Sequence, residues 1–378
     1  MGGNSEPGRV KMEEERAWRG TANREEGSMG AMKGRGAAFN PPNRFEQLIY
    51  QPLDIQLDYE DERPPFRTHF FDDTSRTILA KNDSPDISFT YSINPYRGCE
   101  HGCVYCYARP SHEYLGFSAG LDFESKIMVK RNAPGLLEAA FRKKSWVPQT
   151  VTISGNTDCY QPAERLFRLT RGCLEVFQRF RNPAGIITKN ALILRDLDLL
   201  QEMARLNTVH VLISMITLDP DLVRTMEPRT ASPGSRLHTI NELAKHNIPV
   251  GLNLAPVIPG LTDQEIPALL KAAADNGATA AAFSAVRLPG AVEPLFIDWI
   301  KRTFPDRAEK VLNRIRSTHE GKLNDSRFGS RMTGKGQIAK VINDLFTLHA
   351  SRHGLDKGWD ELATKHFRRD ANEQGELF

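Results

Sequence analysis

The chain has 378 residues, 40% of them hydrophobic and 26% charged, which is long enough for one barrel-sized domain with extensions. Its 50 basic and 47 acidic residues leave a formal net charge of +3. This balance excludes a basic nucleic-acid-binding surface over the whole molecule, so any such surface must be local. Five cysteines, no signal peptide and no long apolar run predict a reduced, cytoplasmic protein that does not bind a membrane.

The N-terminal part differs in composition from the rest. Residues 1–44 are rich in Gly, Glu and Arg and show no apolar periodicity, so they predict a disordered leader. Residues 45–85 contain prolines that suit an extended segment wrapped around a domain. A plain leader fits the same composition.

Strand-like and helix-like runs alternate through a predicted core domain over residues 86–300. The predicted strands cover residues 86–96, 147–155, 184–190, 208–217, 248–258 and 278–288. Helical periodicity covers residues 163–180, 194–206, 235–247 and 263–277. Strand followed by helix, repeated, predicts a parallel sheet. Periodicity alone leaves both a doubly wound sheet and a barrel open.

Three cysteines follow the first predicted strand in the run NPYRGCEHGCVYCYARPSH. Cys99, Cys103 and Cys106 have the spacing C-x3-C-x2-C and supply three thiolates, one fewer than a four-iron cluster binds. A metal position left open by the protein is typical of a reactive centre. A zinc site completed by His101 or His112 and a disulfide are the alternatives that spacing leaves open.

This loop resembles the signature of the radical SAM superfamily, including the aromatic Tyr105 before the third cysteine. The resemblance implies a [4Fe-4S] cluster on the three cysteines, with S-adenosylmethionine on the fourth iron and Tyr105 near the adenine. It implies a reductase such as flavodoxin or ferredoxin as the electron donor. It also favours an α/β fold built as a partial (β/α)6 TIM-like barrel, with the chemistry at the C-terminal ends of the strands.

A polar segment follows the second predicted strand. Its TD-x-YQP-x-E stretch resembles the spore photoproduct lyase-like branch, also described as DNA repair photolyase-related. Superfamily members bind the methionine amino group of the cofactor at this place, so we expect Gly155, Asn156, Thr157 and Asp158 to contact the cofactor. The same residues suit a helix N-cap. Cys159 is a candidate hydrogen-atom donor to a substrate radical, although lone cysteines commonly fill a core.

Polar residues also stand at later strand ends. The resemblance assigns Ser214 to the ribose of S-adenosylmethionine and either Lys189 or Arg229 to its carboxylate. In the segment APVIPGLTDQE, Val257 is expected near the adenine. Each of these residues also fits an ordinary loop, cap or packing position.

Residues 301–378 predict a helical C-terminal extension, with helices at 305–321 and 335–354 and a disordered tail at 366–378. The linker NDSRFGSRMTGKG between these helices carries Arg327, Arg331 and Lys335. These charges could contact the phosphates of a nucleic acid or form a solvated linker.

The sequence therefore predicts a radical SAM enzyme that cleaves S-adenosylmethionine reductively to start radical chemistry. The spore photoproduct lyase-like branch implies lyase chemistry on DNA photoproducts. The alternatives are modification of RNA, of a protein or of a small molecule, or a zinc-binding or iron-sulfur-binding module without catalysis.

Overall fold

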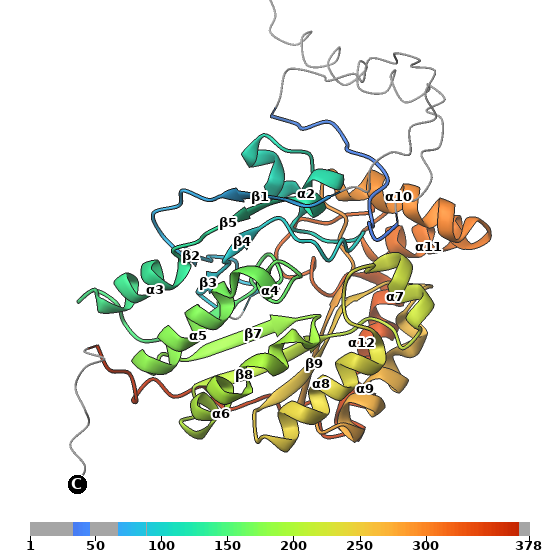
Figure 1. Cartoon of the computed structure of the whole chain (residues 1–378). Helices are drawn as coiled ribbons and strands as arrows, with labels where there is room; N and C mark the ends of the chain where they lie inside the picture. The colour runs from blue at the N-terminus through green and yellow to red at the C-terminus, as the bar shows by residue number, and fades with distance from the viewer. Residues whose placement is uncertain (1–32, 46–66, 88, 370–378) are drawn as a thin grey trace, which may run out of the picture. The chain divides into compact units, whose positions relative to one another are not determined.

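The computed structural model describes residues 33–45, 67–87 and 89–369 (Figure 1). Its main sheet has seven strands in the order β10-β9-β8-β7-β6-β3-β2. These are β2 (Leu79–Lys81), β3 (Tyr91–Ile93), β6 (Val151–Ile153), β7 (Ala184–Thr188), β8 (Val209–Ser214), β9 (Val250–Val257) and β10 (Ala280–Ala285). Only β2 is antiparallel to its neighbour.

The order of the parallel strands decides between the two architectures. From β3 to β10, each strand of the main sheet pairs with the next main-sheet strand along the chain. In a doubly wound sheet the order in which strands are added reverses in the middle of the sheet, whereas in a barrel each new strand is added on the same side. The edge strands β2 and β10 do not pair with each other within the described residues. The prediction of a partial six-stranded parallel barrel is therefore confirmed.

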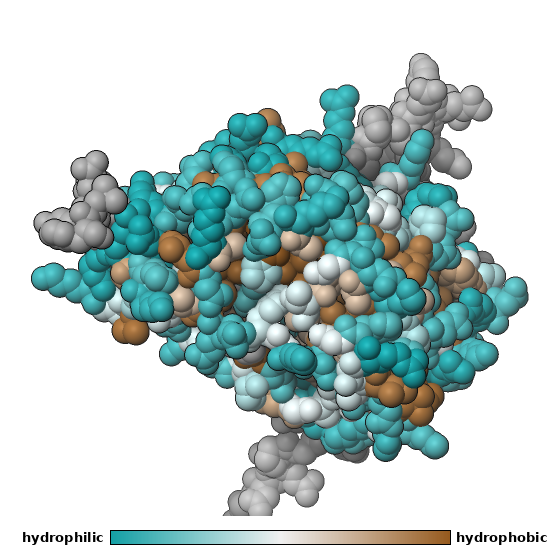
Figure 2. Space-filling view, turned by 90° about the horizontal axis from the view of Figure 1, so that it is seen from below, coloured by the Kyte–Doolittle hydropathy of each residue, from teal (hydrophilic) through white to brown (hydrophobic). Residues whose placement is uncertain are grey.

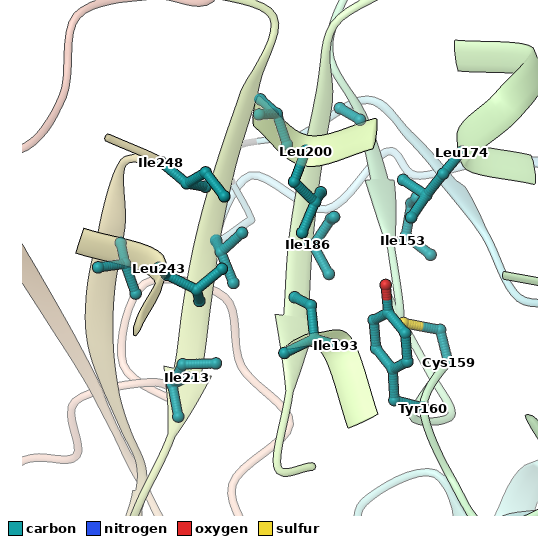
Figure 3. Close-up of a cluster of buried hydrophobic side chains, with 14 of the residues drawn as sticks. Ile153, Cys159, Tyr160, Leu174, Ile186, Ile193, Leu200, Ile213, Leu243 and Ile248 are labelled. Atoms are coloured by element: carbon teal, nitrogen blue, oxygen red, sulfur yellow. The ribbon is translucent and has the colours of Figure 1, made fainter. Parts of the chain in front are cut away.

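Helices follow the parallel strands and cover one face of the sheet (Figure 1). They are α3 (Ala133–Arg142), α4 (Glu164–Phe167), α5 (Leu169–Phe180), α6 (Leu197–Arg205), α7 (Pro220–Met226), α8 (Pro233–Lys245), α9 (Ile266–Asp275) and α12 (Gly336–Arg352), with 3-10 turns η2 (Ala191–Asp196) and η3 (Asp263–Glu265). Alternate strand residues such as Ile186 and Ile213 pack against helical leucines such as Leu200 and Leu243 (Figure 3). This packing forms the main hydrophobic core.

The chain after α12 runs past the N-terminal ends of the strands (Figure 1). Leu355 O accepts from Ala281 N at 2.9 Å, and Ala363 N donates to Asn207 O at 2.8 Å. Trp359 stacks on His210 with ring centroids 4.6 Å apart. The loop that carries the cysteines and the polar segment at residues 154–164 lie at the opposite, C-terminal ends of the strands.

The first predicted strand, residues 86–96, is broken in the structure, so its predicted length was wrong. β3 ends at Ile93, and after Asn94 and Pro95 the chain forms β4 (Tyr96–Arg97) in a second sheet of order β1-β5-β4. This sheet contains β1 (His69–Asp72) and β5 (Lys126–Val129), and η1 (Arg109–Leu115) and α2 (Leu121–Ser125) lie between β4 and β5 in the chain. Pro95 has no amide hydrogen to continue the strand ladder.

The N-terminal segments are partly outside the described residues. Residues 1–32 of the expected leader and 46–66 of the expected wrapping segment fall there. Residues 33–45 are described, and Ala37 and Ala38 are each 4% exposed, so the disorder predicted up to residue 44 does not hold for this part. Their burial escaped the sequence analysis because the run is short and without periodicity.

The C-terminal extension is helical, as predicted, with α10 (Val292–Thr303), α11 (Pro305–Thr318) and α12. The predicted disordered tail lies outside the described residues from 370 onward, but Phe367 packs against Phe141 at 6.3 Å between ring centroids. Hydrophilic residues cover most of the face seen in Figure 2. In the described part of the chain, no helix has the length and apolar character needed to cross a membrane.

Candidate functional site

The cysteine loop follows β4 and is largely buried. Cys99 and Cys103 are 7% and 6% exposed, and Cys106 packs between the apolar groups that surround them. All three cysteines are free thiols, so the disulfide alternative is wrong for this structure. Gly98 and Gly102 have φ values of 82° and 69°, the left-handed region that glycine adopts without strain. One turn lies directly before Cys99 and the other between Cys99 and Cys103, where it lets the loop fold back.

A buried ion pair fixes this loop. Arg109 and Glu124 are both 0% exposed, and Arg109 Nη2 lies 2.5 Å from Glu124 Oε1. The same guanidinium donates through Nε to Cys103 O at 3.0 Å. Glu124 also accepts from Gly36 N at 3.0 Å and Ala37 N at 2.8 Å. The N-terminal segment, α2 and the cysteine loop are thus joined at one carboxylate.

Three thiols in one loop suit the chemistry of an iron-sulfur cluster, because thiolates are its usual ligands. A zinc site would need four ligands about 2.0–2.3 Å from one metal. Cluster cysteines instead bind separate irons. Burial raises the pKa of Cys103 and raises that of Cys106 to about 11. Coordination to iron would remove these protons, because a metal-bound thiol is deprotonated.

Of the two histidines considered as zinc ligands, His101 lies against the Cys99 side chain, whereas His112 has other surroundings. His112 is 0% exposed and packs against the rings of Phe117 and Phe123, with centroid distances of 5.2 and 5.5 Å. His101 Nδ1 lies 3.4 Å from Asp158 Oδ2, and its Nε2 lies 3.2 Å from Asn190 Nδ2. The His101–Asp158 pair connects the cysteine loop to the segment after β6.

Asp158 is engaged at both carboxylate oxygens. Oδ1 accepts from Thr188 Oγ1 at 2.8 Å and from Tyr160 N at 2.9 Å, while Oδ2 accepts from Lys189 N at 2.8 Å. Burial alone would raise the pKa of Asp158, but His101 and the backbone amides of Lys189 and Tyr160 lower it. The carboxylate therefore joins the ends of β6 and β7 to the cysteine loop, and its expected cofactor contact stays a prediction.

Two of the amides expected to face the cofactor already have a protein acceptor. Asn94 Oδ1 accepts from Asn156 N at 2.9 Å and from Thr157 N at 3.1 Å. The Thr157 hydroxyl donates to Tyr96 O at 2.7 Å. The Gly155 carbonyl accepts from the Tyr107 hydroxyl at 2.7 Å. Because Tyr107 directly follows Cys106, this bond links the segment to the cysteine loop. A cofactor amino group needs such an acceptor rather than an amide donor.

A buried charge network lies beside Tyr105, and sequence analysis missed one of its members, Glu227. The Tyr105 hydroxyl donates to Glu227, which also pairs with Lys189 Nζ at 3.2 Å and with Arg236 Nη2 at 2.5 Å. Burial would raise the pKa of Glu227, but Arg236 and Lys189 lower it to about 2. Glu227 and Arg236 stand in the same MEPRTASPGSR run as Arg229, so an acidic residue among those arginines was the available signal.

The remaining residues predicted to bind the cofactor come from several strand ends and loops. The Ser214 hydroxyl, at the end of β8, accepts from Asn253 Nδ2 at 3.2 Å. Val257 is 3% exposed at the end of β9. Arg229 pairs with Glu100 at 3.0 Å and Lys189 pairs with Glu227 at 3.2 Å, so each has a counter-charge, and Lys189 also lies over the Tyr105 ring at 5.7 Å. Of the two candidates for the cofactor carboxylate, Lys189 is the one beside the cysteine loop's tyrosine.

Cys159 lies in the main hydrophobic core. It is 0% exposed and sits beside Tyr160 and Ile153 (Figure 3). The turn after β6 directs its side chain into the interface between the sheet and the helices. This placement favours the packing role, and the hydrogen-donor role has no geometric support here.

The basic linker before α12 is neutralised within the protein. Arg327 pairs with Asp325 at 2.9 Å, Arg331 with Asp86 at 2.5 Å, and Lys335 with Glu320 at 3.0 Å. The solvated-linker interpretation describes these charges better than three free phosphate ligands. The contact with Asp86 also ties this linker to the turn before β3.

Comparison with known proteins gives the context of this site. Residues 93–273 match the family described as the Radical SAM superfamily. A Mycobacterium tuberculosis (strain ATCC 25618 / H37Rv) protein described as uncharacterized is 37% identical over 222 residues, which are 58% of this chain and 65% of that protein. One from Methanocaldococcus jannaschii is 30% identical over 175 residues, covering 46% of this chain and 63% of that protein. The chain thus spans just under two thirds of these relatives' length.

Among solved structures, a spore photoproduct lyase mutant superposes with a TM-score of 0.54 at 16% identity, covering 75% of this chain and 79% of that one. Spore photoproduct lyase complexed with dinucleoside spore photoproduct gives 0.53 at 17% identity, with coverage of 75% and 79%. These likenesses concern the fold. The family match makes residues 93–273 of this chain similar to radical SAM superfamily domains.

Proposed function

We propose that this protein is a radical SAM enzyme in which Cys99, Cys103 and Cys106 hold a [4Fe-4S] cluster and S-adenosylmethionine occupies the iron that they leave open. The family that residues 93–273 match uses these two cofactors. The observation that carries the proposal is the set of three free thiols in one buried loop next to the C-terminal end of β3. When bound, such a cluster would supply the electron for reductive cleavage of S-adenosylmethionine, which releases methionine.

The protein's own residues hold this loop in place. Arg109 binds the carbonyl of Cys103, and Glu124 orients Arg109 from behind the loop. Glu227 keeps Tyr105 and Lys189 together at the ends of the strands. In this proposal Tyr105 and Val257 offer apolar contact to the adenine, Ser214 a hydroxyl to the ribose, and Lys189 a charge to the carboxylate. A water-poor site would strengthen each of these polar contacts.

The reaction proposed first for testing is lyase-type repair of a DNA photoproduct. Its support is the fold shared with spore photoproduct lyase, for which one structure is described as a complex with dinucleoside spore photoproduct. The alternatives of RNA, protein or small-molecule modification use the same radical-generating centre and differ only in the substrate. An electron-donating reductase such as flavodoxin or ferredoxin completes the proposal.

The first experiment tests the centre. Anaerobically reconstituted protein should bind iron and sulfide and, with dithionite, convert S-adenosylmethionine to 5'-deoxyadenosine. Cys103→Ala should abolish this product, while Cys173→Ala should retain it because Cys173 is 0% exposed in the main core. Undiminished product from Cys103→Ala, or a preparation that binds zinc but no iron, would refute the proposal.

The second experiment tests the substrate class. Deoxyadenosine formation should be compared without addition and with duplex DNA, ultraviolet-irradiated DNA and RNA. Stimulation by irradiated DNA together with loss of the photoproduct supports repair. Stimulation by RNA alone would replace the repair proposal with RNA modification.

A further inference from the structure

A half-buried arginine lies at the mouth of the barrel without a counter-charge of its own. Arg287 follows the C-terminal end of β10, and its guanidinium lies over the Tyr107 ring, 5.4 Å from the centroid. Within the described residues, its side chain makes no hydrogen bond or ion pair. A guanidinium has five N–H donors, and leaving them unpaired away from water costs free energy.

The carboxylate that acts electrostatically on Arg287, Asp86, is already paired with another arginine. Asp86 Oδ2 pairs with Arg331 Nε at 2.5 Å, and Asp86 Oδ1 accepts from Gly329 N at 2.7 Å. Arg331 and Asp86 both act electrostatically on Arg287, and burial together with Arg331 lowers the Arg287 pKa. Asp86 is thus paired with Arg331 and acts on Arg287 only through its field, so the Arg287 charge has no ion-pair partner among the described residues.

This charge stands beside the candidate radical-generating loop. Tyr107 follows Cys106 directly in the chain, and its hydroxyl reaches the Gly155 carbonyl after β6. On the other side, Ala285 N of the edge strand β10 donates to Met332 O at 2.7 Å. The linker that contains Met332 therefore contacts both the edge strand β10 and the turn at Asp86, which precedes β3.

Exposed aromatic rings accompany the arginines. Tyr107 is 49% exposed, and Phe328 is 61% exposed with the Arg331 guanidinium 4.5 Å from its ring centroid. An arginine that can grip a phosphate bidentately next to exposed rings that can stack on bases is the chemistry of single-stranded nucleic-acid binding. A peptide carboxylate would use the arginine but would gain less from two exposed rings.

We propose that Arg287, Tyr107 and Phe328 form a substrate subsite that binds a nucleotide, with Arg287 on a phosphate and the rings against bases. The inference rests on the proposed radical SAM function, because it places the subsite next to the reactive loop. It names the substrate class, a nucleic acid with an unpaired segment. The neutralised charges of Arg331, Arg327 and Lys335 are not its phosphate ligands.

The test uses the full reconstituted chain under anaerobic conditions and a short fluorescein-labelled oligothymidylate, with binding followed by fluorescence anisotropy over a range of KCl concentrations. Arg287→Gln should weaken binding about tenfold, as loss of a charge-assisted hydrogen bond does. It should also reduce the slope of log K against log salt by about 0.7, the value for one phosphate contact on a single strand. A merely structural role would not change this slope.

Two further variants separate the ring from the charge. Phe328→Leu should weaken binding about fivefold or more through lost stacking while leaving the salt slope unchanged. Arg205→Gln is the matched control, because Arg205 is 67% exposed on α6 and pairs only with Glu202 among the described residues. It should bind the oligothymidylate as the wild type does.

Several results would overturn the inference. Equal affinity of Arg287→Gln and Arg205→Gln for the oligothymidylate would remove Arg287 from the subsite. Loss of S-adenosylmethionine affinity with intact oligothymidylate binding would assign Arg287 to the cofactor carboxylate, and equal competition by polyglutamate would indicate a peptide ligand. Iron content and deoxyadenosine formation, measured on the same preparations, show separately whether the radical SAM proposal itself fails.

Discussion

Glu124→Gln is the substitution that tests how the cysteine loop is held. The change keeps the volume of the side chain but removes its charge. In the wild type the carboxylate meets three donors, namely Arg109 Nη2, Gly36 N and Ala37 N, at 2.5, 3.0 and 2.8 Å. An amide has one acceptor oxygen, so its NH2 group would face at least one of these donors.

The expected loss of stability follows from the burial of both partners. Arg109 and Glu124 are each 0% exposed, so the substitution leaves an uncompensated buried guanidinium. Removing one partner of such a pair costs about 3–5 kcal/mol. With a urea m-value of roughly 3 kcal/mol/M, the unfolding midpoint should fall by about 1–1.7 M. Because Arg109 also binds Cys103 O at 3.0 Å, the iron content after reconstitution should fall as well.

The assay is urea unfolding followed by circular dichroism, together with iron and sulfide analysis. Glu320→Gln is the control, since Glu320 is half exposed and pairs on the surface with Arg327 and Lys335. Its midpoint should match the wild type, as exposed pairs contribute little. If Glu124→Gln shifts the midpoint no more than Glu320→Gln does, the reasoning that this pair fixes the loop is wrong.

Three further outcomes are expected. Burial lowers the pKa of His210 to about 4, against roughly 6.5 in an unfolded chain, so the unfolded state binds more protons between these values and stability should fall as pH decreases through them. His210→Gln should flatten this part of a plot of unfolding free energy against pH, and an unchanged slope would contradict the assignment. Gly36→Ala would place its Cβ 1.8 Å from Gly102 O, so it should lower the free energy of unfolding by about 1–3 kcal/mol and lower iron retention. Gly234→Ala is its control, because a Cβ there meets no atom within 4 Å, and it should behave as the wild type in both measurements. Cys159→Ala should cost about 1 kcal/mol in unfolding and leave substrate-dependent turnover intact, and a selective loss of turnover would restore the hydrogen-donor role.

Much of the barrel could be predicted because its parallel strands are covered by amphipathic helices. Ile186 and Ile213 alternate with residues of the other sheet face, and helical leucines such as Leu200 recur at helical spacing. These periods reflect local backbone geometry, so they are visible without the fold. The short strands β1, β2, β4 and β5 have two to four residues each and too little periodicity to detect.

The sequence by itself determined the three cysteines and their spacing, since a ligand set within a short loop is encoded locally. Only the tertiary structure showed that Tyr105 and Arg236 meet at Glu227, that Gly36 packs on the cysteine loop at Gly102, and that Cys159 faces the core. These relations join residues far apart in the chain, or depend on the direction of one turn. Long-range contacts of this kind arise when buried charges must find partners, and that requirement leaves no periodic trace in the sequence.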